Sequence, residues 1–186
     1  VASGRLGALL VQFPWSFRRT QENRVWLGRI AECFEGYPLV VEVRHESWNT
    51  PEVFDGLHAR AIAFCNIDQP IFQDSIAPSD HVTAPLGYVR FHGRNKANWF
   101  KEGVSQNEGY DYLYSEEELK PWLGLIQSMQ GKAKNVYVVT NNHFHGQAVA
   151  NALEIQAALG GGRFQLPEHL LAAYPRLRGI SVGAMG

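Results

Sequence analysis

The chain has 186 residues, of which 45% are apolar, and a formal net charge of −1. This composition fits a globular domain with a hydrophobic core, and the balanced charge excludes bulk attraction to nucleic acid or to anionic membranes. The longest apolar runs are far too short to span a bilayer. Cys33 and Cys65 lack Cys-x-x-Cys spacing, so we expect reduced thiols in a cytoplasmic protein.

Five short runs rich in apolar and β-branched residues predict strands, and segments of helical periodicity lie between and after them. Capping signals mark two helix starts, a threonine before Pro51 and a serine before three glutamates at position 115. In chain order, we expect strand Leu6–Phe13, helix Gln21–Phe34, strand Pro38–Arg44, helix Pro51–Leu57, strand Ala61–Ile67, strand Leu86–His92, helix Ser115–Met129, strand Asn135–Asn141, helix Gly146–Leu159 and helix Pro167–Tyr174.

The alternation of strands and helices predicts an α/β fold with a parallel sheet and helical crossovers. An open doubly wound sheet for dinucleotides would need a glycine-rich turn after its first strand, where this chain has Pro14, Trp15 and Ser16. The strand centres recur about every 32 residues, close to the spacing of units in a (β/α)8 barrel. We therefore expect residues 1–186 to form a single domain, the C-terminal part of a TIM-type (β/α)8 barrel that supplies roughly its last five β/α units.

Polar side chains gather where the predicted strands end, and in parallel α/β proteins this edge binds ligands. Within the fourth strand, Arg90 and His92 share one face while Val89 and Phe91 share the other. The expected ligand-binding residues are Gln12, Arg44, Trp48, Asn66, Arg90, Gly93, Arg94, Asn95, Asn141 and Asn142, and the expected proton-transferring residues are Glu42, His45, Asp68 and His92.

A charge count indicates the class of ligand. Counted as facing inward, Glu42 and Asp68 offset two of the three arginines at positions 44, 90 and 94, which leaves one guanidinium for an anion. The leading hypothesis is therefore an enzyme acting on a small anionic substrate, either phosphorylated or carboxylated. A purely structural ion pair of Glu42 with an arginine is the alternative, because an unpaired buried charge is costly.

Glu42 and Arg90 lie on predicted strands that are two steps apart. Alternate strands of a TIM barrel fill the same interior layer with their side chains. We therefore predict a direct charge-assisted hydrogen bond between Glu42 and Arg90.

A nucleic-acid-binding module is a second hypothesis. It would use Arg94, Lys96, Trp99 and Lys101 on one rim loop, where basic residues alternate with an aromatic one. A net charge near zero and the presence of a single such loop argue against it.

A metal-dependent hydrolase or isomerase is a third hypothesis, with the four proton-transferring candidates as ligands from different strand ends. His143 and His145 lack the i, i+4 spacing of helical zinc ligands. We assign no residue to a metal, and neither a cofactor nor an oligomeric state follows from the sequence. For Asn141 and Asn142, capping of the next helix is an equal alternative to ligand binding.

Four segments in this order, "LLVQFPWSF", "VVEVRHESW", "YVRFHGRN" and "VYVVTNNHFHGQAVANA", resemble the YecE-like family, labelled domain of unknown function 72. The resemblance runs over nearly the whole chain and implies a TIM-barrel-like fold in a bacterial cytosolic protein, usually of about 250 residues or more. Compared with that family, the chain lacks the N-terminal portion with its aromatic- and glycine-rich opening. The family implies no established activity.

Overall fold

The computed structural model describes residues 4–99 and 106–185. Its elements are, in chain order, β1 (Leu9–Gln12), α1 (Gln21–Cys33), β2 (Leu39–Glu42), η1 (Glu46–Trp48), α2 (Pro51–Ala59), β3 (Ala63–Asp68), β4 (Leu86–Phe91), α3 (Gln106–Gly109), α4 (Glu116–Gln130), β5 (Asn135–Thr140), η2 (Phe144–Gly146), α5 (Gln147–Gly160), β6 (Phe164–Pro167), α6 (Glu168–Ala173), η3 (Pro175–Ile180) and β7 (Ser181–Met185).

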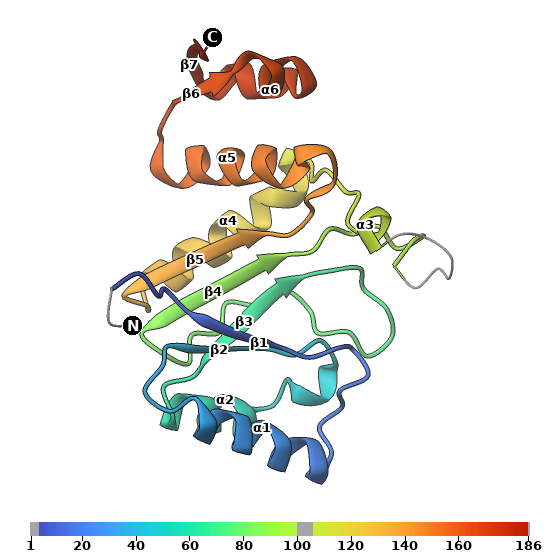
Figure 1. Ribbon diagram of the computed structural model, residues 1–186, viewed down its shortest axis with the longest axis vertical. Helices are drawn as coiled ribbons and strands as arrows, with labels where there is room; N and C mark the ends of the chain where they lie inside the picture. The colour runs from blue at the N-terminus through green and yellow to red at the C-terminus, as the bar shows by residue number, and fades with distance from the viewer. Residues whose placement is uncertain (1–3, 100–105, 186) are drawn as a thin grey trace.

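The centre of the fold is a parallel five-stranded sheet in the order β1-β2-β3-β4-β5, which confirms the five predicted strands. Each strand pairs with the one before it, so the order does not reverse as it does in a doubly wound sheet. The sheet curls into a half-barrel, with α1 and α2 beside one end of it and α4 and α5 beside the other (Figure 1). All carboxyl ends of the strands therefore meet at one edge.

Burial follows from the strand sequences. Every residue of β2 and β3 is buried, which explains why their apolar runs show no clear alternation. In β4 the pattern alternates, because Val89 and Phe91 pack against α4 while Tyr88 and Arg90 lie on the other face. Two of the helices beside the sheet begin at the predicted caps: α2 follows Thr50, and Ser115 forms a capping box with Glu118 at the start of α4.

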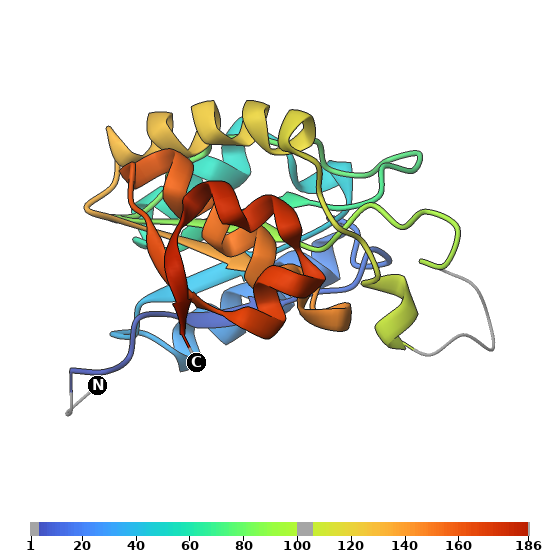
Figure 2. The same ribbon diagram turned by 90° about the horizontal axis from the view of Figure 1, so that it is seen from above.

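A second, two-stranded sheet of β6 and β7 was not predicted. With α6 it lies beyond α5, away from the five strands (Figures 1 and 2). Leu166, Leu171 and Leu177 form a small core there. Strands β6 and β7 are short, and glycines lie beside or within them, so the sequence shows little β periodicity there. Among the described helices, none is both long and apolar enough to cross a membrane.

Candidate functional site

Glu42 lies at the end of β2, is fully buried, and receives hydrogen bonds from the nitrogen atoms of three side chains. Its Oε1 accepts from Arg44 Nε at 3.0 Å and lies 2.9 Å from His92 Nε2, while its Oε2 accepts from Arg90 Nη1 at 2.9 Å. The predicted hydrogen bond between Glu42 and Arg90 is therefore confirmed. We call these four residues the Glu42 cluster.

The strand register places the Glu42 cluster on the inner face of the half-barrel. Gln12 is the register partner of Glu42, and its Oε1 accepts a hydrogen bond from Arg90 Nη1. Between β2 and β4, the inner face of β3 contributes Cys65, whose Sγ lies 3.8 Å from Glu42 Oε2. The cluster and its contacts Gln12 and Cys65 thus draw on the strands from β1 to β4.

Electrostatics in the cluster favour an ionised Glu42 and a neutral His92. Burial acts to raise the pKa of Glu42, but the hydrogen bond from His92 and the charges of Arg44 and Arg90 hold that pKa at about 2. Burial lowers the pKa of His92 and outweighs the opposing effect of Glu42. Two guanidinium groups therefore face one carboxylate, and one positive charge stays uncompensated within the cluster.

His92 is held at both ring nitrogens. In the tautomer with the proton on Nε2, the ring donates to Glu42, and Nδ1 accepts from Asn141 Nδ2 over a long 3.3 Å. Trp99 and Tyr110 lie around the imidazole, with ring centroids 6.2 and 6.3 Å from it. Tyr110 lies on the loop between α3 and α4, and no strand-end pattern predicted its place beside His92.

The expectation that Asp68 faces inward with Glu42 is wrong. The register pairs Ile67 with Arg90, so Ile67 shares the inner face and Asp68 points to the opposite one. There Asp68 accepts from Arg94 Nε at 2.9 Å and Nη2 at 2.6 Å, from the Tyr114 hydroxyl at 2.6 Å and from Trp122 Nε1 at 2.6 Å. Both oxygens are engaged, so Asp68 and Arg94 form a structural pair outside the Glu42 cluster.

Two other predicted ligand-binding residues are held by contacts inside the protein. Asn66 bonds through its Nδ2 to the backbone oxygens of His81 and Tyr88. Trp48 is buried and donates from Nε1 to the backbone oxygen of Phe17 at 2.7 Å. The structure does not bring Asn66 or Trp48 to the Glu42 cluster.

Asn142 and Asn95 hold loops in place. Asn142 is fully buried and donates to the Tyr112 backbone and to Asn151, so it links the end of β5 to α5. Asn95 donates to the backbone oxygens of Glu108 and Asp111. Both contacts stabilise the segment that follows β4.

Gly93 fixes the turn after β4. Its φ of +87° lies in the left-handed region, and its N–H donates to the Tyr114 hydroxyl at 2.8 Å. A Cβ at this position would lie 2.8 Å from the Cβ of Tyr112. The turn therefore requires glycine both for its backbone angle and for lack of space.

His45 lies apart from the Glu42 cluster, in the loop after β2. Its Nδ1 accepts from the Ser47 N–H at 3.1 Å, and its ring lies 5.2 Å from that of Trp15. Of the loop residues predicted to bind nucleic acid, Arg94 is held by Asp68, Lys96 lies over the ring of Phe72 at 5.2 Å, and Lys101 falls outside the described residues.

Within residues 4–99 and 106–185, no group of three or more histidine, cysteine or acidic side chains is arranged to hold a metal ion. Glu42 and Asp68 cannot share one metal ion, because their side chains lie on opposite faces of the sheet. The arrangement at the strand ends instead places two guanidinium groups around one carboxylate.

A family model described as "Protein of unknown function DUF72" matches residues 1–173. The chain belongs to the DUF72 family. This result confirms the resemblance found in the four sequence segments.

Three relatives illustrate the extent of the match. UPF0759 protein YunF of Bacillus subtilis is 28% identical over 162 residues, which cover 82% of this chain and 57% of that protein. The crystal structure of a DUF72 family protein from Thermotoga maritima is 38% identical, with a TM-score of 0.77 over 83% of this chain and 58% of that one. A DUF72 family protein from Enterococcus faecalis is 32% identical, with a TM-score of 0.76 over 85% of this chain and 60% of that one. The chain thus spans less than two thirds of these DUF72 relatives.

Substitution of Gly93 by alanine should destabilise the fold more than the same change at Gly146. Both glycines have positive φ, +87° and +83°, but a Cβ at Gly146 meets nothing within 4 Å. We expect Gly146→Ala to cost about 1 kcal/mol from backbone strain and Gly93→Ala about 3 kcal/mol, since the Tyr112 clash adds to the strain. Urea unfolding of both variants measures this difference, and equal costs would show that the clash is absent.

Glu42→Gln should be less stable than the wild type at neutral pH, and this difference in stability should shrink as the pH falls. At neutral pH the variant leaves the cluster arginines without a counter-ion, which costs about 3 kcal/mol. Because the pKa of Glu42 is lowered from 4.5 to about 2, this stabilisation is complete above pH 4.5 and is lost as the pH falls toward 2. The gap between wild type and variant in urea unfolding should narrow over that window. Glu35→Gln, on an exposed loop, serves as the control and should show no such gap.

Proposed function

We propose that the inner face of the half-barrel binds a small anionic ligand, phosphorylated or carboxylated, and that the complete protein is an enzyme acting on it. The observation that carries this proposal is the uncompensated positive charge of the Glu42 cluster, where Arg44 and Arg90 face one carboxylate. Arg90 adds a second support, because its Nε is buried and has no hydrogen-bond partner among the described residues. Planar guanidinium donors suit both phosphate and carboxylate oxygens.

His92 is the proposed proton carrier of this site. Its lowered pKa keeps the imidazole neutral at neutral pH, the state in which it can accept a proton. Glu42 holds the Nε2–H and would stabilise the imidazolium formed on protonation, while the weak 3.3 Å contact of Nδ1 with Asn141 leaves that nitrogen as the accepting atom. Glu42 itself, with a pKa of about 2 and three donors, is a poor base.

The half-barrel is, on this proposal, the C-terminal part of one closed TIM-type (β/α)8 barrel domain. Its sequential strand order and the share of 57–62% that the chain covers in its relatives support this interpretation. Ligands of such barrels bind at the carboxyl ends of the strands, where the Glu42 cluster lies. A cytoplasmic location stays a prediction.

Arg90→Gln should weaken the binding of inorganic phosphate to this site while the protein stays folded. Glu42 keeps two of its three donors in the variant, Arg44 and His92, which limits the loss of stability. Loss of a charged donor should weaken binding at least about tenfold, as measured by isothermal titration calorimetry in low salt. The matched control is Arg178→Gln, an exposed arginine paired with Glu168, which should bind as the wild type does.

Equal phosphate affinity of Arg90→Gln and wild type would contradict the proposal. So would a crystal soaked in phosphate in which the inner face holds no anion and Arg90 Nε bonds to protein instead.

A further inference from the structure

His45 carries a buried N–H donor without an acceptor. Its Nδ1 accepts from the Ser47 N–H at 3.1 Å and lies 3.0 Å from Ser47 Oγ, which in turn accepts from the Arg19 N–H at 2.8 Å. These contacts assign the ring proton to Nε2. Only 6% of His45 is exposed, and Nε2 has no hydrogen-bond partner in the part of the chain that the structure describes. Such a buried donor is costly unless something accepts from it.

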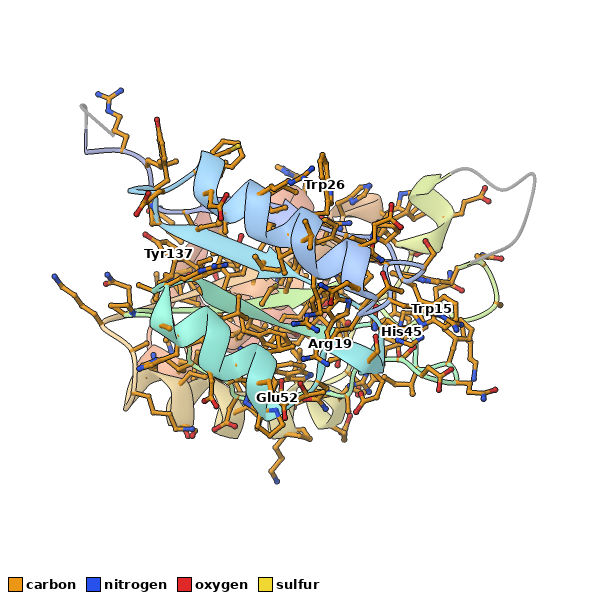
Figure 3. All side chains as sticks on the ribbon, turned by 90° about the horizontal axis from the view of Figure 1, so that it is seen from below. Trp15, Arg19, Trp26, His45, Glu52 and Tyr137 are labelled. Atoms are coloured by element: carbon orange, nitrogen blue, oxygen red, sulfur yellow. The ribbon has the colours of Figure 1, made fainter. Side chains whose placement is uncertain are left out.

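Trp15 presents a second donor of the same kind beside it. The indole Nε1–H is also buried without a partner among residues 4–99 and 106–185. The two rings lie 5.2 Å apart at 51°, and Figure 3 shows the two side chains next to each other at the strand-end side of the molecule. The guanidinium of Arg18 lies 5.6 Å from the centre of the Trp15 ring. Two N–H donors and one cation thus gather at the loops after β1 and β2.

We propose that Trp15 and His45 form an oxyanion-binding site, separate from the Glu42 cluster, that takes one phosphate or carboxylate group. The two N–H groups donate to its oxygens, and Arg18 supplies the favourable charge. An oxyanion fits better than a neutral acceptor because the Arg18 guanidinium, over the Trp15 ring, adds positive charge beside one of the two donors.

The test is a titration of the protein with inorganic phosphate, observed through the indole N–H signals in ¹H–¹⁵N correlation spectra. Trp15→Phe identifies the Trp15 signal, and sodium chloride at matched ionic strength serves as the reference. We expect a saturable shift of the Trp15 signal with phosphate and none with chloride. In His45→Phe, which keeps an aromatic ring but lacks the donor, the dissociation constant from that signal should rise about tenfold or more.

Arg90→Gln separates this site from the one in the Glu42 cluster. If the two sites are distinct, Arg90→Gln leaves the phosphate response of the Trp15 signal unchanged, whether or not the Glu42 cluster binds an anion. A Trp15 signal that ignores phosphate, that responds equally in His45→Phe, or that loses its response in Arg90→Gln would overturn the inference.

A second observation covers the case in which His45→Phe does not fold. The imidazole ¹⁵N resonances of His45 in the wild type should move at Nε2 on addition of phosphate, and this movement should be weakened in Trp15→Phe. An Nε2 resonance that stays in place in the wild type would also overturn the inference.

Discussion

Glu42 is a fully buried carboxylate at the end of β2, and such a group is tolerated only when donors and cations surround it. This constraint orders the inner face of the half-barrel. Arg44, just after the end of the same strand, and Arg90 and His92, at the end of β4 two strands away, all converge on its two oxygens. The arginines outnumber the carboxylate, so the same contacts that stabilise Glu42 leave a positive charge that an anion can use. The same contacts therefore account both for the stability of the buried Glu42 and for the proposed anion binding.

The opposite face of the sheet also holds a buried carboxylate, but there its charge is balanced. Asp68 is also buried, but it is matched by one arginine, one tyrosine hydroxyl and one indole, which leave no surplus charge. The burial of Tyr114 beside Asp68 raises the pKa of its hydroxyl, so it stays a donor at ordinary pH. Through Gly93 and Arg94 this second network fixes the turn after β4, and thus the place of His92 on the inner face.

The sequence predicted the five strands because apolar runs are a local signal. It also predicted the pairing of Glu42 with Arg90, because alternate strands of a barrel regularly fill the same interior layer. It failed at Asp68, since β3 is buried on both faces and its pattern does not reveal which side chains point inward. Trp48 follows a polar motif, yet it folds back onto Phe17 to form a stacked pair, a tertiary contact without local signal. The Trp15–His45 pair joins two loops that are 30 positions apart, and only the structure brings their donors together.

The most direct test of this account is the ionisation of Glu42 itself. Its side-chain carboxyl ¹³C resonance, assigned by comparison with Glu42→Gln, can be followed by NMR as the pH is lowered in the folded protein. If two arginines and His92 hold the carboxylate as described, the resonance titrates with a pKa of about 2, well below its ordinary value of 4.5. A pKa at or above 4.5 would show that burial outweighs the cations, and would contradict both the cluster and the surplus charge on which the proposed function rests.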